Sequence, residues 1–281
     1  MFNFFRILFS PIIAILDFIT KYFKTIVFLT IIYFIVSTSN ENLTDVNSHA
    51  NLQKIELSGP IMDVSKTLED IQKAKEDKNI KGILFVVNSP GGAVAPSVEL
   101  AYAIKELKDI KPVVVYASGV IASGSYYASI WANKIIANPG SMVGSIGVIM
   151  QGVNAEELMQ KIGVSTQTVK AGKYKESGTP TRKWFDYEEK QLQSVIDDTY
   201  NMFISDVASA RNLDVKNHNL FADAKIFTSK QAKDVGLVDE VATLSYAQDS
   251  LIKLAKVEKA VWKKEDKFEK FMDKLISEAV S

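Results

Sequence analysis

The sequence predicts an α/β fold in which a mostly parallel sheet carries flanking helices. From Leu52 onward, short apolar segments rich in β-branched residues alternate with segments of helical pattern, the order expected when helices connect parallel strands. Hydrophobic residues make up 47% of the chain, enough for a substantial core. The expected strands are Gln53–Gly59, Gly82–Val87, Val113–Ala117, Lys134–Asn138 and Thr166–Gly172. The expected helices between them are Val64–Lys78, Pro96–Asp109, Gly124–Ala132 and Ala155–Ile162.

The composition and charge exclude several functions. The net charge is zero and the isoelectric point is near 6.8, so the chain lacks the excess of basic residues that a nucleic acid partner usually requires. Cysteine is absent, which excludes disulfides, thiol catalysis and cysteine-based metal sites. The absence of cysteine does not identify the cellular compartment, because a protein outside the cytoplasm need not contain cysteine.

The N-terminal segment predicts a membrane anchor. Thr25–Asn40 carries no charge, and Tyr22–Ser39 is long enough to cross a bilayer if the Lys24 side chain extends to its surface. Basic residues precede this segment and acidic residues follow it, so the positive-inside rule places the N-terminus in the cytoplasm and the chain after residue 40 outside. A cleaved signal peptide is the alternative, since Ser37 and Ser39 fit a cleavage site, but its charged leader would be unusually long.

These patterns divide the chain into four parts. Residues 1–40 form an interfacial segment and the anchor, 41–51 a polar tether, 52–243 the α/β domain and 244–281 a helical tail. Within the domain a long helix is expected over Asp186–Arg211, with Asp186 as N-cap and Glu189 completing a capping box. A shorter helix, Ser229–Val235, ends at Gly236. The tail Lys263–Val280 has one apolar face, which is expected to pack on its own domain or on a neighbouring subunit.

Two turns rich in glycine and serine follow apolar strands. They are NSPGG (Asn88–Gly92) and GVIASGSYY (residues 119–127). In a parallel sheet both turns emerge at the carboxyl ends of strands, where ligand sites usually lie. Glycine allows a backbone N–H to approach a ligand oxygen closely, so one N–H from each turn could form an oxyanion hole. A phosphate site is less consistent with the sequence, which has neither a GxGxxG nor a Walker A motif.

Ser123 is a better candidate nucleophile than Ser118. Ser118 ends an expected strand and would be held in the ladder or in the turn. Ser123 begins a helical stretch, so its hydroxyl lies at the positive end of a helix dipole and the Gly124 N–H is available to an oxyanion. The alternative is that Ser123 is an ordinary helix N-cap, the commonest role of serine at such a position.

The base is expected to be a lysine. His49 lies in the tether and His218 in a distant loop, and no GxSxG sequence surrounds Ser123, so a Ser-His-Asp triad is not expected. Lysine can accept a proton where its surroundings keep it neutral, and lowering a lysine pKa from about 10.4 to about 7–8 requires roughly 4 kcal/mol. The turn AGKYKESGTP is the best candidate, but the residues alone do not choose between Lys173 and Lys175.

The ordered set of motifs resembles the signal peptide peptidase A family, membrane-anchored bacterial Ser–Lys peptidases with a fold related to the Clp protease and crotonase families. The resemblance covers about residues 52–243 and fits the short form with one protease domain. The motifs that carry it are NSPGG, IASGSYY, VGSIGVI, GKYKESGTP and the segment Phe221–Val241. The matched residues are the nucleophile Ser123, the general base Lys175, the lysine-orienting Ser145, the oxyanion-hole amides of Gly92 and Gly124, and Gly91, which supports the turn. Ser125 is a departure, because the family commonly has glycine there.

The resemblance also implies a function. It implies a serine endopeptidase that degrades hydrophobic peptides such as cleaved signal peptides, without a metal or cofactor. Its expected place is the bacterial inner membrane, crossed once, with the catalytic domain on the periplasmic side of a homo-oligomeric, octameric ring. One alternative is a crotonase-like acyl-thioester enzyme, which would rely on carboxylates and on a coenzyme that is not supplied outside the cytoplasm. The other is a catalytically silent membrane scaffold, against which the presence of Ser123, Ser145 and Lys175 argues.

Overall fold

The computed structural model describes residues 18, 20–30 and 47–264. The chain forms two compact units, residues 1–51 together with 261–281, and Leu52–Ala260. In the first unit residues 20–30 are helical, with Phe23, Phe28 and Leu29 exposed. Within the described ranges no helix is long and apolar enough to cross a membrane. Part of the predicted span, residues 31–39, and the tail beyond Lys264 lie outside the described residues.

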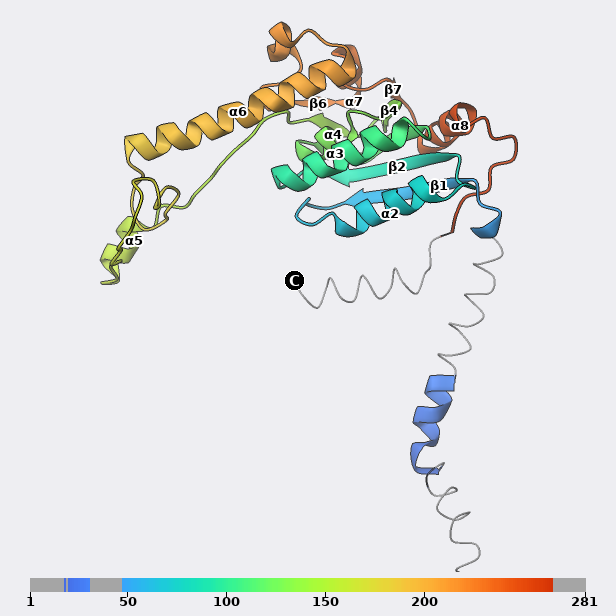
Figure 1. Ribbon diagram of the computed structural model, residues 1–281, viewed down its shortest axis with the longest axis horizontal. Helices are drawn as coiled ribbons and strands as arrows, with labels where there is room; N and C mark the ends of the chain where they lie inside the picture. Colours follow the sequence, from blue (N-terminus) through green and yellow to red (C-terminus); the bar gives the residue numbers. More distant parts are fainter. Residues whose placement is uncertain (1–17, 19, 31–46, 265–281) are drawn as a thin grey trace, which may run out of the picture. The chain divides into compact units, whose positions relative to one another are not determined.

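A seven-stranded mixed sheet forms the centre of the second unit (Figure 1). Five strands are parallel and lie in the order β1 (Leu52–Ser58), β2 (Gly82–Ser89), β3 (Val113–Ala122), β4 (Lys134–Ala137) and β7 (Glu240–Val241). β5 (Met142–Gly144) pairs in parallel with the last residues of β3, and β6 (Ile226–Thr228) pairs antiparallel with β5. The sheet therefore agrees with the predicted α/β class.

Helices flank the sheet. Their bounds are α2 (Ser65–Glu76), α3 (Val94–Lys108), α4 (Gly124–Ser129), α5 (Glu156–Lys161), α6 (Asp186–Arg211), α7 (Ser229–Asp234) and α8 (Leu244–Leu254), with a 3-10 helix at Val215–Leu220. α2 and α3 lie in front of the sheet in Figure 1, and α8 packs on β2 and β3. Gly82 lies against Leu251 of α8 and against Ala255, which follows the helix; a Cβ at Gly82 would lie 2.9 and 3.0 Å from these side chains. β2 and β3 are buried along most of their length, as expected of parallel strands covered on both faces.

Several local expectations were wrong. Thr166–Gly172 is not a strand: its residues are exposed and no strand among the described residues pairs with them, so β propensity alone has nothing to stabilise it. β3 continues five residues beyond the predicted end at Ala117, because β5 pairs with this extension. The N-cap of α6 is Phe185 instead of Asp186, and its amide donates to Glu188 instead of Glu189, at 2.9 Å.

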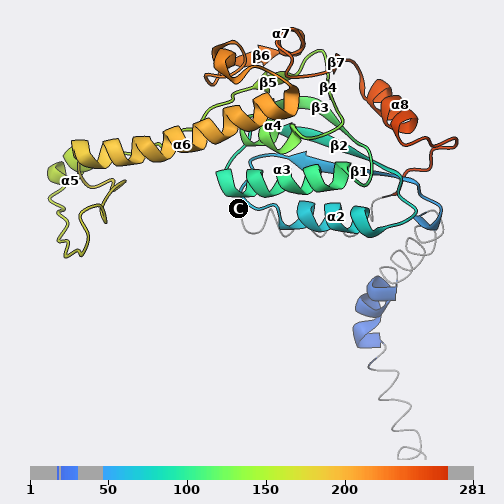
Figure 2. The ribbon, with the colours of Figure 1, turned by 45° about the horizontal axis from the view of Figure 1, so that its top comes forward.

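One part of the second unit extends away from the sheet. Figures 1 and 2 both show α5, the loops around it and the N-terminal end of α6 beyond the sheet. We call residues 150–190 the arm. α5 has no buried residue, and several apolar side chains of the arm are exposed, among them Val153, Leu158, Ile162 and Val169. The arm therefore presents apolar surface that the described part of the chain does not cover.

Candidate active site

The two glycine turns meet at one end of the sheet. β2 ends at Ser89 and β3 at Ala122, and a register shift after Val87 brings Ser89 opposite Ile121. Gly91 has φ +91°, and a Cβ there would lie 2.6 Å from the Gly124 nitrogen and 2.9 Å from the Ser123 Cβ. Only glycine fits this approach, so the NSPGG turn packs directly against the candidate nucleophile.

Ser123 occupies a strained turn between strand β3 and helix α4. Its φ of 53° and ψ of −125° are unusual for a residue with a side chain, and such conformations cost about 1–3 kcal/mol. The neighbouring backbone holds it there, since the Ser123 N–H donates to Gly144 O at 2.8 Å and the Tyr127 N–H donates to Ser123 O at 3.0 Å. Its side chain makes no N-cap hydrogen bond. The ordinary N-cap interpretation is therefore wrong, and the sharp strand-to-helix turn is of the kind that exposes a nucleophilic hydroxyl.

The amides of Gly92 and Gly124 lie on the same side of this turn. Gly92 forms a parallel bridge with Ile61, in which Ile61 bonds to Gly91 O and to the Ala93 N–H at 2.9 and 2.8 Å. In a parallel bridge the N–H of the central residue points away from the partner strand. Gly124 begins α4, and the first N–H of a helix has no intrahelical acceptor. A Cβ at Gly124 would lie 3.4 Å from the Gly92 nitrogen, so both amides can face one oxygen beside Ser123.

Three further serines surround the turn. Ser145 directly follows Gly144, whose carbonyl accepts a hydrogen bond from the Ser123 N–H. Ser145 is half-buried with φ 50°, and its own N–H donates to Lys225 O at 2.7 Å. Ser125 is fully buried: its hydroxyl accepts from the Ala122 N–H at 2.9 Å and lies 2.6 Å from Ser89 O. It thus links the two glycine turns, which gives the departure from glycine a structural role. Ser118 donates to Val87 O at 3.2 Å and is held in the sheet as predicted.

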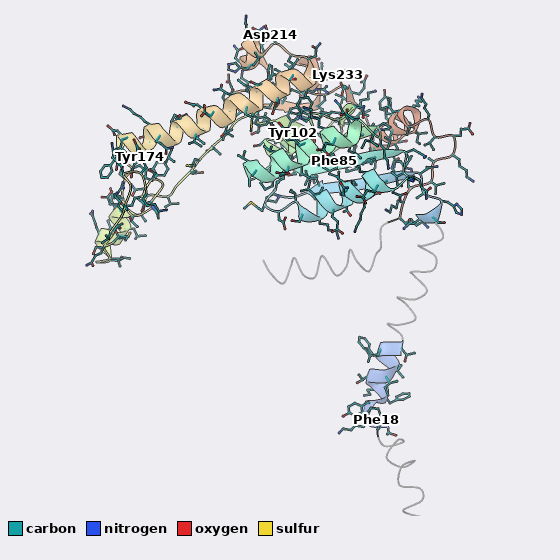
Figure 3. All side chains as sticks on the ribbon, in the orientation of Figure 1. Phe18, Phe85, Tyr102, Tyr174, Asp214 and Lys233 are labelled. Atoms are coloured by element: carbon teal, nitrogen blue, oxygen red, sulfur yellow. The ribbon has the colours of Figure 1, made fainter. Side chains whose placement is uncertain are left out.

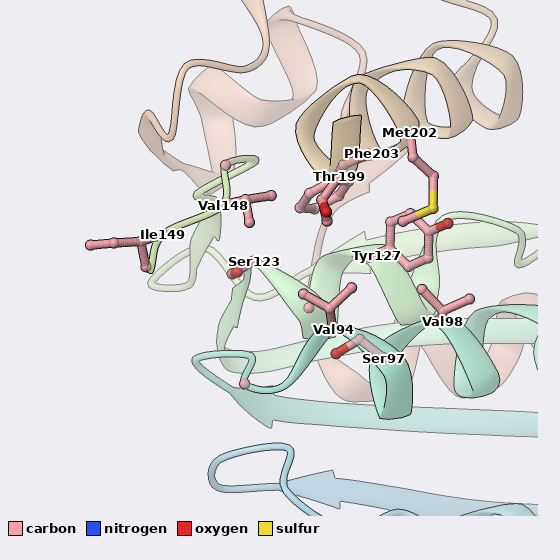
Figure 4. A pocket seen from close by; sticks show the side chains of 13 residues that line it. Val94, Ser97, Val98, Ser123, Tyr127, Val148, Ile149, Thr199, Met202 and Phe203 are labelled. Atoms are coloured by element: carbon pink, nitrogen blue, oxygen red, sulfur yellow. The ribbon is translucent and has the colours of Figure 1, made fainter. Parts of the chain in front are cut away.

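A largely apolar pocket of about 100 Å³ opens beside Ser123 (Figure 4). Its walls come from α3, α4, the segment after β5, and the C-terminal half of α6. The lining residues are Gly92, Val94, Ser97, Val98, Ser123, Gly124, Tyr127, Gly147, Val148, Ile149, Thr199, Met202 and Phe203. Tyr127 packs edge-on against Phe203 at 5.0 Å between ring centroids, and its hydroxyl donates to Asp206. Burial and this carboxylate raise the pKa of Tyr127 well above its usual range, so its phenol stays neutral.

Lys175 lies elsewhere in the same chain. Its loop contacts the first turn of α6, where the Tyr187 hydroxyl donates to Lys173 O at 3.4 Å, and Figure 3 labels the neighbouring Tyr174 at that end of the helix. The pocket begins at Thr199, twelve residues further along the helix. At 1.5 Å per residue the two places are about 18 Å apart along the axis. The structure thus brings Ser123, Gly91, Gly92, Gly124 and Ser145 together, and does not bring Lys175 to them within one chain.

The structure separates the two candidate lysines of this loop. The Lys173 amine lies 4.4 Å from the centre of the Tyr187 ring, a cation–π contact that holds the lysine side chain against α6 of the same chain. Lys175 is exposed, and its amine has no hydrogen bond or ion pair with the part of the chain that the structure describes. His218 does not line the pocket and lies against Tyr200, with an Nδ1–Oη distance of 3.5 Å.

An ion-pair network in the arm was not anticipated from the sequence. Arg182 binds both carboxylate oxygens of Glu188, at 2.8 and 2.9 Å, and Glu188 is fully buried. A second nitrogen contact joins Arg182 to Glu176 at 3.5 Å, and Glu176 also binds Lys170. In the sequence, the only sign of the Arg182–Glu188 pair is the spacing of five residues between them. That spacing spans a loop, so it does not show that the two side chains meet. Among the described residues no cluster of His, Asp and Glu could hold a metal ion.

Acid is expected to loosen this part of the arm. Hydrogen bonding to Arg182 holds the pKa of Glu188 at about 2, below its ordinary 4.5, so its contribution to stability is complete above about pH 4.5 and is lost as the pH falls toward 2. Trp184 donates to Thr179 O at 2.9 Å in the same loop and can report the change by fluorescence once Trp131 and Trp262 are replaced by Phe. A red shift is expected in this pH window, and Glu188→Gln should show it already at neutral pH. An emission maximum that is constant down to pH 2 would contradict this assignment.

Comparison with known proteins adds the family. The model of Peptidase family S49 matches residues 105–258, more than half of the chain. A Methanocaldococcus jannaschii protein named provisionally as a protease is 46% identical over 190 residues, which cover 68% of this chain and 60% of that protein. A provisionally named signal peptide peptidase of Enterococcus faecium is 33% identical over 235 residues, 79% of this chain and 67% of that protein. The chloroplastic serine protease SPPA of Arabidopsis thaliana is 32% identical over 190 residues, 67% of this chain but only 28% of that protein.

Proposed function

The chain belongs to peptidase family S49, and on that premise we propose that it is a serine endopeptidase with a Ser123–Lys175 dyad that degrades hydrophobic peptides such as cleaved signal peptides. The family and the protease names of the relatives support a protease function. The observation that best supports Ser123 as the nucleophile is its strained turn, which lies beside two glycine amides at the mouth of an apolar pocket.

The proposed reaction gives each of these groups one role. The Ser123 hydroxyl attacks a peptide carbonyl whose neighbouring apolar side chain occupies the pocket, while the amine of Lys175 takes the hydroxyl proton. The Gly92 and Gly124 amides stabilise the oxyanion, each by about 3–4 kcal/mol in comparable sites. Lys175 then returns the proton to the leaving amine, and water hydrolyses the acyl-enzyme. Ser145, next to the residue that anchors Ser123, orients the lysine amine.

The lysine comes from a neighbouring copy of the chain. Within one chain its loop contacts Tyr187, which lies about 18 Å along α6 from Thr199 of the pocket. The arm that carries it exposes apolar side chains, and α5 buries no residue of its own. Such a surface is expected to be covered by another molecule. The arm of one subunit therefore docks beside Ser123 of the next, a head-to-tail contact that closes into a ring, with the octamer as the expected size.

The charge-free N-terminal segment supports a membrane anchor for this assembly. The charge-free stretch within Tyr22–Ser39 acts as the anchor, with the N-terminus inside and the catalytic domain outside the cytoplasm. An anchored ring keeps the sites close to apolar peptides that leave the bilayer, and its enclosed cavity admits only extended chains. These substrates match the apolar lining of the pocket.

Peptide cleavage tests the proposal directly. The full chain, purified in detergent as an oligomer, is expected to cleave a fluorogenic peptide of apolar residues and to cleave poorly the same peptide with aspartate at the apolar positions. Ser123→Ala should lower the rate by about 10⁴-fold or more. A folded wild-type oligomer that cleaves no peptide would favour the silent scaffold instead.

A further inference from the structure

Lys175 lies in a loop that has no regular secondary structure to position it. Residues 172–179 form consecutive turns, with hydrogen bonds from the Lys175, Ser177 and Thr179 amides to Gly172, Tyr174 and Glu176 carbonyls at 3.0–3.2 Å. Gly172 and Gly178 adopt φ values of +96° and +87°, and a Cβ at either glycine would meet nothing within 4 Å. Such a loop is mobile unless side chains fix it, yet proton transfer requires the amine within hydrogen-bond distance of the serine hydroxyl.

The Arg182–Glu188 pair fixes this loop to α6. Glu188 lies in the first turn of the helix and its side chain is fully buried, whereas Arg182 lies in the segment that leaves the loop. Both guanidinium–carboxylate contacts are short, at 2.8 and 2.9 Å, and a bidentate pair restricts orientation as well as distance. Glu188 also accepts the Phe185 N–H at 2.9 Å, which ties the same carboxylate to the start of the helix.

The Arg182–Glu188 pair also contacts Glu176, the residue next to Lys175. Arg182 contacts Glu176 at 3.5 Å, and Glu176 directly follows Lys175 in the chain. Lys170 binds the same carboxylate from the other side of the turns. The rigid helix is therefore connected through Glu188, Arg182 and Glu176 to the backbone that carries the amine. A buried ion pair usually adds little net stability compared with apolar side chains of similar size, so its value here lies in the geometry that it imposes.

We propose that Glu188 and Arg182 are positioning residues that hold Lys175 in the orientation from which it accepts the Ser123 proton. This inference rests on the proposed function of Lys175 and deepens it. Neither side chain is placed to bind substrate, because Glu188 is fully buried within the arm and its carboxylate holds the Arg182 guanidinium. Their loss should therefore affect the chemical step and leave substrate binding in the pocket unchanged.

The test compares kcat with KM for hydrolysis of the apolar fluorogenic peptide by the full-length oligomer. Glu188→Gln keeps the shape of the side chain and removes its charge, and is expected to lower kcat by about 10- to 100-fold with KM changed less than about twofold. Arg182→Lys keeps the positive charge but cannot form two parallel hydrogen bonds to the Glu188 carboxylate, so an intermediate loss of kcat is expected. Glu189→Gln is the matched control: it removes the same charge from the next, exposed residue and should leave kcat unchanged.

Lys175→Ala, measured in parallel, separates the two proposals. If Lys175→Ala retains activity, the proposed dyad fails and this inference fails with it. If Lys175→Ala is inactive while both Glu188→Gln and Arg182→Lys keep the wild-type kcat, the positioning role alone is wrong. A loss of kcat that disappears after correction for the amount of assembled oligomer, measured by light scattering, would also overturn it. If Glu188→Gln does not fold, Arg182→Lys carries the test, since it preserves the ion pair.

Discussion

Lys175→Ala is expected to lower kcat for peptide hydrolysis by about 10⁴-fold or more, since loss of the general base in a serine peptidase costs up to about 10⁶-fold. The described residues that line the pocket include no histidine, lysine or carboxylate, so no other side chain of the lining is expected to take the hydroxyl proton. The fold should be unaffected, because the Lys175 side chain is exposed. The measurement is kcat for the apolar peptide, together with the melting temperature of the variant.

Lys173→Ala is the control for this prediction. Its amine contacts the Tyr187 ring at 4.4 Å in its own chain, so its removal should reduce kcat only a few-fold. The opposite pattern, an active Lys175→Ala and an inactive Lys173→Ala, would move the base to Lys173. Equal activity of both variants and the wild type would exclude a lysine base in this loop.

Gly124→Ala is expected to lower kcat by about 10²- to 10³-fold with a small change in KM. A Cβ at this position would overlap the Ser97 hydroxyl and lie 3.0 Å from the Ser97 Cβ, so helices α3 and α4 must move apart. That movement displaces the Gly124 amide, which is one of the two donors to the oxyanion. The oxyanion forms only during the reaction, so the effect should appear in kcat.

Ser97 supplies the control for the oxyanion prediction. Its hydroxyl donates to Ala93 O at 2.8 Å and lies where the new methyl group would be. Ser97→Ala alone should be nearly as active as the wild type, and the Gly124→Ala, Ser97→Ala double variant should recover part of the lost kcat. A double variant no better than Gly124→Ala would show that the loss does not arise from this overlap.

The sheet was predictable from the sequence because its signals are local. The apolar runs at β1 to β4 are each bounded by polar or glycine residues, and the structure places strands at all four. The short strands β5, β6 and β7 were missed, since two or three residues carry no detectable period and exist only through pairing with a neighbouring strand. The false strand at Thr166–Gly172 is the converse case, a favourable local pattern without a partner.

The site was only partly predictable for a related reason. Glycine turns after strands indicate where backbone amides converge, and Ser123, Gly92 and Gly124 do meet. The α6 wall of the pocket, formed by Thr199, Met202 and Phe203, depends on how a long helix crosses the end of the sheet, which no sequence period encodes. The distance between Lys175 and Ser123 likewise depends on the path of the arm.

The measurement that tests the central claim most directly combines two inactive variants. Ser123→Ala retains the lysine arm and Lys175→Ala retains the nucleophile, so each is expected to be inactive alone. If the dyad forms between neighbouring subunits, mixed oligomers obtained by co-expression with two affinity tags should regain up to about a quarter of the wild-type kcat, the share of contacts that pair an intact serine with an intact lysine. Mixed oligomers as inactive as the single variants would contradict a dyad shared between chains.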